Sequence, residues 1–255
     1  MYVARESGLH KLHPLTKALL TLLLLVAGFT LPGNWTGYFL VAFIILPLAL
    51  WGGIFREFIK AVGIVSLPFI ISVVLIQSFF WGKGTPIFEF WILSPKWEGV
   101  MFALVSVGRI ILVMAGFILF AMTTRPDMLM ISLKQVGAPS SLAYIIVTTL
   151  QIVPSFQRKA STILDAQRSR GLETEGNLFV RSRALVPVVL PLVLGSLVEV
   201  EERAIAIEAR GFNSSKEETS VIEIPDTKGQ ILLRRIFIIL MFLCIITRIT
   251  WQLLN

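Results

Sequence analysis

Two arginine–glycine pairs, Arg170-Gly171 and Arg210-Gly211, carry the most specific chemistry in this sequence. Each pair closes a segment that begins apolar and proline-bearing and then becomes charged. A guanidinium held on the rigid tip of a helix presents a planar fork of N–H donors that matches the oxygens of a carboxylate. The pattern indicates two helix tips that suit carboxylate-lined grooves, and a pair of tips suits two grooves on a dimeric partner.

Ordinary helix termination is the competing interpretation of each pair taken alone. The last carbonyls of a helix are unpaired and lie at the negative end of its dipole, which favours a nearby arginine. Glycine follows because the next residue often adopts left-handed backbone geometry. Two similar ends within one stretch, residues 139–212, favour docking over termination, although termination explains why these residue types are tolerated there.

Arg109 is a further candidate because it lies about midway along an apolar segment, residues 100–122. An arginine inside a membrane is energetically unfavourable and is by default a functional candidate. It could pair with a carboxylate, bind a partner subunit or extend toward the interface. A packing role against backbone carbonyls is an equally good interpretation.

Motifs for catalysis are missing from the sequence. The stretch 82–85 (Gly-Lys-Gly-Thr) lacks the earlier glycine of a phosphate-binding loop and the Ser or Thr directly after the lysine. The glutamates of 199–202 form the densest acidic cluster, but helical spacing spreads them around the helix. His10 and His13 could share a helix face, with no carboxylate or cysteine completing a metal site. We expect no catalytic residue, no metal ion and no bound cofactor.

The composition is that of a membrane protein. Charged residues make up 15% of the chain, against about 25% in soluble domains, hydrophobic residues make up 55%, and the mean hydropathy is +0.81. The net charge of +7 therefore indicates orientation in a bilayer. Because the sequence has no exposed basic stripe with interleaved aromatic residues, we expect no nucleic-acid partner.

The hydrophobic segments predict an all-α integral membrane protein with about five transmembrane helices. Basic residues near the N-terminus and in the 52–60 loop place the N-terminus in the cytoplasm and the C-terminus outside a cell membrane. We expect a membrane domain over 1–122, a cytoplasmic helical region over 123–230 and a last transmembrane helix over 231–255. The expected spans cover residues 18–31, 35–51, 61–81, 100–122 and 231–254.

The cytoplasmic insert is predicted to be helical. A threonine cap, Pro126 and Asp127 begin a short amphipathic helix that stops at Gly137. A second helix runs from about Ser140 to Arg170, and a third covers 181–210 on the same plan. Both long helices carry prolines in an apolar first half and charges in the second half.

Four short motifs in order resemble the transmembrane T component of energy-coupling factor (ECF) transporters. Residues 166–171 (Ala-Gln-Arg-Ser-Arg-Gly) and 208–212 (Glu-Ala-Arg-Gly-Phe) resemble that family's paired Ala-Arg-Gly signatures. Residues 12–17 (Leu-His-Pro-Leu-Thr-Lys) resemble its N-terminal Leu-x-Pro-x-Thr-Lys. Residues 123–126 (Thr-Thr-Arg-Pro) resemble its Thr-Thr-x-Pro step, so the resemblance extends over nearly the whole chain.

The resemblance implies a non-catalytic coupling subunit. Such a subunit joins two cytoplasmic ABC-type ATPases, which bind the ATP, to a small membrane substrate-binding (S) subunit for vitamin or nickel/cobalt uptake. The implied ATPase-docking triplets are Ser169-Arg170-Gly171 and Ala209-Arg210-Gly211, and Ser169 departs from the family's usual alanine. The alternative class is an integral-membrane scaffold, or an enzyme with a cytoplasmic helical insert.

Overall fold

The computed structural model describes residues 7–31, 33–80, 85, 96–173, 176–211 and 224–254. Within these ranges the chain is helical and contains no strand, so the predicted all-α fold is confirmed. Contacts group the chain into a membrane unit, Met1–Ser132 with Ile224–Asn255, and an α7–α8 unit, Leu133–Glu223. The domain boundaries predicted at residues 122 and 230 separate functional regions and not contact-based units, so they stay a prediction.

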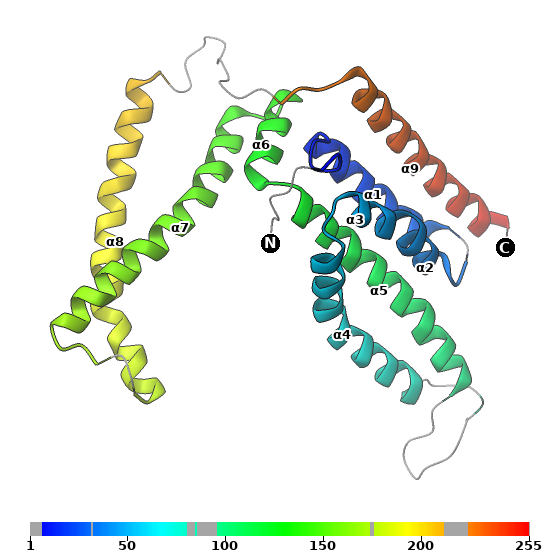
Figure 1. Ribbon diagram of the computed structural model, residues 1–255, viewed down its shortest axis with the longest axis horizontal. Coiled ribbons are helices and arrows are strands. Elements are labelled where there is room, and N and C mark those ends of the chain that lie inside the picture. The colour runs from blue at the N-terminus through cyan, green and yellow to red at the C-terminus, as the bar shows by residue number, and fades with distance from the viewer. Residues whose placement is uncertain are drawn as a thin grey trace. The chain divides into compact units, whose positions relative to one another are not determined.

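The membrane unit consists of one helix for each predicted span. α4 begins earlier than expected, so Arg56 and Lys60 lie in its first turns and not in a loop. The helices are α1 (Pro14–Thr30), the continuous run α2 (Thr36–Leu40), η1 (Val41–Ile45) and α3 (Leu46–Trp51), α4 (Phe55–Phe79), α5 (Trp97–Thr123) and α9 (Lys228–Leu254) (Figure 1).

Three of these helices, α4, α5 and α9, are long and apolar enough to cross a membrane. α1 and the Thr36–Trp51 run are shorter apolar helices. At about 1.5 Å per residue, the 17 residues of α1 extend for roughly 26 Å, close to the lower limit for a hydrocarbon core about 30 Å thick. The membrane class is confirmed. That the two shorter helices also cross the membrane, which would give five spans, stays a prediction.

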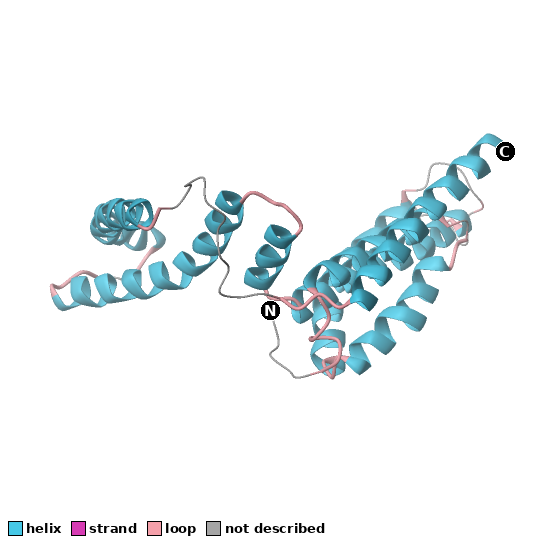
Figure 2. Cartoon of the chain, turned by 90° about the horizontal axis from the view of Figure 1, so that it is seen from above, coloured by secondary structure: helices cyan, strands magenta, loops and turns pink. Residues whose placement is uncertain are grey.

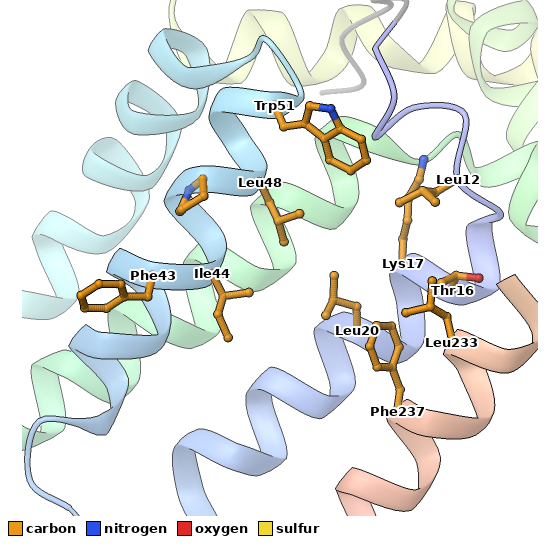
Figure 3. Close-up of a pocket in the computed structure, with 11 residues that line it drawn as sticks. Leu12, Thr16, Lys17, Leu20, Phe43, Ile44, Leu48, Trp51, Leu233 and Phe237 are labelled. Atoms are coloured by element: carbon orange, nitrogen blue, oxygen red, sulfur yellow. The ribbon is translucent and has the colours of Figure 1, made fainter. Parts of the chain in front are cut away.

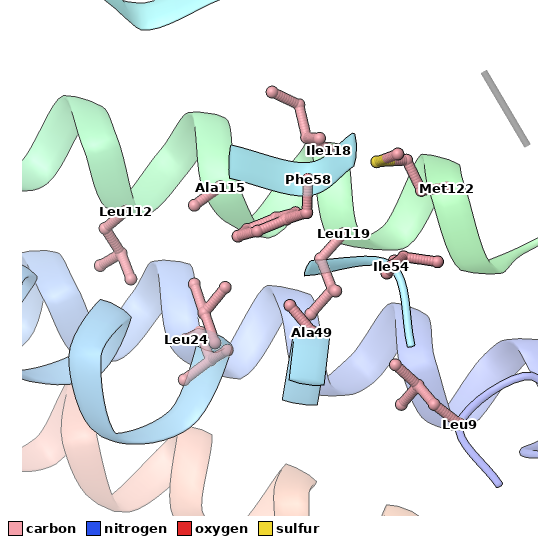
Figure 4. Close-up of a cluster of buried hydrophobic side chains, with 11 residues drawn as sticks. Leu9, Leu24, Ala49, Ile54, Phe58, Leu112, Ala115, Ile118, Leu119 and Met122 are labelled. Atoms are coloured by element: carbon pink, nitrogen blue, oxygen red, sulfur yellow. The ribbon is translucent and has the colours of Figure 1, made fainter. Parts of the chain in front are cut away.

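The core of the membrane unit lies where α4 and α5 pack together with α1 and α3. Phe58, Ile54 and Leu112 are fully buried there, and Figure 4 shows Phe58 against α5. The N-terminal end of α2 packs directly on the α5 backbone, because a Cβ added at Gly37 would lie 2.5 Å from the carbonyl oxygen of Gly108. Apolar side chains and close backbone contact therefore fix this bundle.

A π-helical turn, η1, interrupts the second apolar helix just before Pro47. Proline lacks an N–H, and its ring clashes with the carbonyl four residues earlier, here Phe43. The turn adapts the helix to this clash: the Leu46 N–H donates to the carbonyl of Val41. Such turns are rare and often occur at functional sites, and the sequence alone did not predict this one.

The α7–α8 unit contains the two long helices predicted for the insert, α7 (Ser140–Ser169) and α8 (Leu178–Ala209). They pack against each other and cross, as Figures 1 and 2 show. α6 (Pro126–Gln135) precedes them and ends near Gly137, whose φ is +105°, as predicted. α8 starts earlier than expected, so residues 178–180 are helical and do not belong to a polar connection.

Candidate functional site

The end of α7 is a complete left-handed helix cap. Arg170 is the C-cap residue, and Gly171 follows it with φ +87°. The N–H of Gly171 donates to the carbonyl of Arg168 at 2.9 Å, and the N–H of Leu172 donates to the carbonyl of Gln167 at 3.0 Å. This pair of bonds is the Schellman arrangement. The predicted glycine geometry is confirmed here.

The end of α8 repeats this geometry within the described residues. Gly211 has φ +72°, and its N–H donates to the carbonyl of Glu208 at 2.9 Å. Arg210 occupies the position that Arg170 holds on α7, and a small residue, Ala209, precedes it as Ser169 precedes Arg170. The similarity predicted from sequence therefore extends to the backbone conformation of both ends.

Neither tip arginine is engaged by another side chain among the described residues. Arg170 and Arg210 are exposed, and in the described part of the structure their guanidiniums make no ion pair or hydrogen bond. Nearby arginines differ: Arg168 lies 3.7 Å from the Asp165 carboxylate, and Arg203 donates to Glu199 at 3.3 Å. An arginine near a helix C-terminus can hydrogen-bond the last carbonyls of its helix, and neither tip arginine does so within the described residues. Docking of the tips to a partner stays a prediction.

The α7–α8 crossing positions the two tips. The Lys159 ammonium pairs with the Glu199 carboxylate, and Gln167 Nε2 donates to the Pro187 carbonyl at 3.4 Å. The hydrogen bond from Lys159 lowers the pKa of Glu199. At about 1.5 Å per residue, the 32 residues of α8 extend for roughly 48 Å. Because α8 begins shortly after the α7 tip, its own tip lies far from the first (Figure 1).

Arg109 lies on α5 beside the start of α2. A Cβ at Gly37 would lie 3.0 Å from the Arg109 backbone nitrogen, and the Tyr38 hydroxyl donates to the Leu104 carbonyl at 2.8 Å. The Nε of Arg109 is buried and has no hydrogen-bond partner within the described residues. Arg109 therefore lies beside the start of α2 within the membrane unit, and its role stays a prediction.

The described residues contain no group of three or more His, Cys, Asp or Glu side chains that could hold a metal ion. His13 caps α1, where its Nδ1 accepts from the Leu15 N–H, and His10 Nδ1 lies 2.7 Å from the Ser7 hydroxyl. Both histidines thus have local roles. The stretch 82–84, which resembles part of a phosphate loop, lies outside the described residues.

The burial of Lys17 was not predicted from the sequence, which indicated only a basic residue near the N-terminus. In the structure only 5% of Lys17 is exposed. Its Nζ donates to the carbonyl of Thr123 at 2.8 Å and to that of His10 at 3.2 Å. The position of Lys17 in the first turn of an apolar helix could have indicated this burial, because a lysine there needs hydrogen-bond acceptors inside the protein.

The fold and the two helix tips define the class of this protein. It is a helical membrane protein with a second helical unit, whose two tip arginines make no ion pair within the described residues.

The comparisons with known proteins agree with this class. The CbiQ family, described as cobalt transport protein, matches residues 5–221, and the chain therefore belongs to that family. Three relatives are each called energy-coupling factor transporter transmembrane protein EcfT. They come from Thermosediminibacter oceani (28% identical, covering 90% of this chain and 89% of the relative), Clostridium kluyveri (27%, covering 98% and 96%) and Listeria innocua (29%, covering 86% and 85%). The predicted family is confirmed.

Proposed function

We propose that this chain is the transmembrane coupling subunit of an ECF-type importer. It transmits the motions of two cytoplasmic ABC-type ATPases to a small membrane substrate-binding subunit. The ATPases bind and hydrolyse the ATP, and this chain is not catalytic. The cargo is a micronutrient, a vitamin or a nickel or cobalt ion, and the family description favours cobalt.

One observation carries the proposal: both long helices end in a left-handed glycine, and the arginine before each glycine makes no ion pair within the described residues. We assign Ser169-Arg170-Gly171 to one ATPase and Ala209-Arg210-Gly211 to the other. The small residue before each arginine leaves room for the walls of a groove. The left-handed glycine ends each helix directly after an exposed arginine. A carboxylate in each ATPase groove would complete the contact.

The S subunit is assigned to the apolar surfaces of α6, α7 and α8. Within the described part of the α7–α8 unit, Val188 is the only buried apolar side chain. Large exposed apolar patches mark interaction sites on proteins or membranes. The exposed apolar side chains on α7 and the first half of α8 are Ile145, Ile146, Leu150, Val153, Leu185, Val186, Val189, Leu190, Val193 and Leu194.

The orientation follows from the charges. Lys11 and Lys17 precede or begin α1, Arg56 and Lys60 begin α4, and Arg234 lies near the start of α9. The positive-inside rule places these helix ends in the cytoplasm. The N-terminus is then cytoplasmic and the C-terminus lies outside, so both arginine tips face the compartment that contains ATP.

The test reverses the charge of both tips. The chain is co-expressed with two ATPase subunits of an ECF-type transporter, and ATPase recovery and uptake of the cargo are measured for Arg170→Glu, Arg210→Glu and the double variant. Loss of a well-buried arginine anchor costs about 2 kcal/mol or more, which raises Kd roughly 30-fold. We expect each single variant to recover less ATPase and the double variant to recover none.

Matched controls come from the paired arginines on the same helices. Arg168→Gln changes the residue beside the first tip, and Arg203→Gln changes a residue on α8. Both should retain ATPase and uptake. Normal ATPase recovery by the double variant would exclude tip docking, and it would favour a scaffold or an enzyme with a helical insert.

A further inference from the structure

An apolar cavity of about 560 Å³ lies between α1, the η1–α3 segment and α9. Leu20 of α1, Ile44 of η1, Leu48 of α3 and Phe237 of α9 line it, and Figure 3 shows them around one space. The π-helical turn before Pro47 supplies Phe43 and Ile44 to this wall. Because α1 packs against both α9 and α5, the cavity lies within the membrane unit.

A smaller, more polar cavity of about 280 Å³ lies beside the first one. His10 and Lys11, the Thr124 and Arg125 step before α6, and Ile224 are among the residues that line it. Leu12 and Lys17 line both cavities. The two spaces therefore meet at the start of α1, with a basic compartment on one side and an apolar one on the other.

The charge of the polar compartment is positive. Arg125 is balanced by Asp127 at 2.7 Å, whereas Lys11 is exposed and makes no ion pair among the described residues. The Lys17 ammonium uses two N–H groups on the carbonyls of His10 and Thr123. An ammonium has a third donor, which is available to a ligand. The compartment is thus suited to an anion.

A polar group also lines the apolar cavity close to Lys17. Thr16 is 3% exposed, and its hydroxyl has no hydrogen-bond partner within the described residues. A buried hydroxyl without a partner is unfavourable and calls for an explanation. The ester carbonyls of a glycerolipid lie between its phosphate and its acyl chains, and Thr16 lines the apolar cavity next to Lys17, which lines both cavities.

We propose that these adjoining cavities form a binding site for one anionic phospholipid. The phosphate lies beside Lys11 and Lys17, the ester region lies beside Thr16, and one acyl chain packs against Leu20, Ile44 and Phe237. Basic pockets between transmembrane helices bind anionic headgroups, with about 1 kcal/mol for each nearby lysine or arginine. A free anion would use the polar cavity and leave the apolar one unexplained. This inference does not depend on the proposed coupling function.

Native mass spectrometry of the full-length chain, purified in detergent, tests the site. Phosphatidylglycerol and phosphatidylcholine with the same acyl chains are titrated against the wild type and variants. We expect one phosphatidylglycerol to be retained under conditions that remove phosphatidylcholine. Lys11→Gln should weaken phosphatidylglycerol about fivefold, which corresponds to about 1 kcal/mol. Leu20→Trp fills the apolar cavity and should displace the lipid.

Lys60→Gln is the matched control, because Lys60 is an exposed lysine near the start of α4 that does not line either cavity. It should bind phosphatidylglycerol like the wild type. Three results would overturn the proposal: equal binding of phosphatidylcholine, an equal loss in Lys60→Gln, or displacement of the lipid by soluble glycerol phosphate. Lys11→Gln alters an exposed side chain, so it keeps the test valid if Leu20→Trp fails to fold. Unchanged lipid binding in a folded Leu20→Trp variant would instead leave the apolar cavity to a partner helix, which also contradicts the proposal.

Discussion

The membrane unit and the α7–α8 unit are both built from long helices with apolar segments, yet they bury those segments differently. Phe58 and Leu112 of the membrane unit are at most 1% exposed. On α8, Leu190 is 61% exposed and Leu197 is also 61% exposed. The first unit is held together by its own core, whereas the second leaves most of its apolar surface for lipid or for other proteins.

In the proposed coupling role, the α7–α8 unit would position its two tips without a large core. Its arginine tips are fixed by the length and stiffness of two crossed helices and by a few polar contacts, such as Lys159 with Glu199. A bundle with a filled core would have little apolar surface left to offer a partner. The contrast between the units is tested by the following variants, beginning with the largest expected effect.

Truncation of a core side chain should show the difference in stability between the two units most clearly. Phe58→Ala removes a ring that is 1% exposed, and we expect a loss of about 3–5 kcal/mol of stability. Leu190→Ala, on the exposed face of α8, should change stability by only about 0.5 kcal/mol. Thermal loss of the monodisperse peak in detergent measures both. Equal destabilisation by the two variants would contradict the contrast.

Close backbone packing in the membrane unit should be the next most sensitive feature. A Cβ at Gly37 would meet the carbonyl of Gly108, which belongs to a buried helix and cannot move aside as a flexible side chain can. We expect Gly37→Ala to cost about 1–3 kcal/mol. Gly63 of α4 is the matched control, because a Cβ there meets nothing within 4 Å. The same thermal measurement should show Gly63→Ala to be neutral or slightly stabilising.

Changes at the helix tips should affect binding more than folding. Gly171 has φ +87°, and a Cβ there meets nothing within 4 Å, so Gly171→Ala strains only the backbone, by about 1 kcal/mol. We expect ATPase affinity to fall about fivefold, with a loss of stability no larger than this strain. Gly195→Ala, inside α8 and also without a neighbour within 4 Å, should leave affinity unchanged. Surface plasmon resonance with purified ATPase would decide whether the turn holds Arg170 in place.

The smallest effect is expected at the α7–α8 crossing. The pKa of Glu199 is lowered, first by the hydrogen bond from Lys159. The ionised carboxylate therefore stabilises the crossing above the ordinary glutamate pKa, about 4.3, and this contribution is lost as pH falls through the lowered value. Lys159→Gln should remove it at neutral pH. Because both side chains are partly exposed, the loss is expected to be small.

Spin labels can measure this change, because Cys244 is the only cysteine. In a Cys244→Ser background, labels at Gln157 and Glu202 report the distance between α7 and α8 by double electron–electron resonance. Lys159→Gln at pH 7 and the parent protein at low pH should both broaden the distance distribution slightly. A variant that showed its full pH response without Lys159 would assign the titration to another group.

Most of the helical architecture followed from local patterns. Proline at the first turn of α6, glycine after α6, α7 and α8, and apolar runs between charged ends placed these helices within a few residues. The start of α4 was predicted too late, because Arg56 and Lys60 were taken for loop residues. They tolerate a helix because a first turn at the membrane surface can keep both side chains in water.

Other features required contacts that the sequence does not display. The π turn before Pro47, the direct contact of Gly37 with the α5 backbone and the burial of Lys17 each involve residues far apart in the chain or competing backbone hydrogen bonds. Arg109 shows the same limit. The sequence showed that Arg109 lies in an apolar run, but it did not show which residues of α2 lie beside it.

The sequence by itself determined the membrane class, the family, the helix ends and the two arginine–glycine tips. These properties depend on composition and on residues within a turn or two of each other, so short-range physical chemistry decides them. Tertiary structure decided that, among the described residues, both tip arginines are unpaired while Arg168 and Arg203 are paired. It also decided that Lys17 is buried between two carbonyls and that two cavities meet beside it. Pairing, burial and cavity shape are set by side chains that only the folded chain brings together.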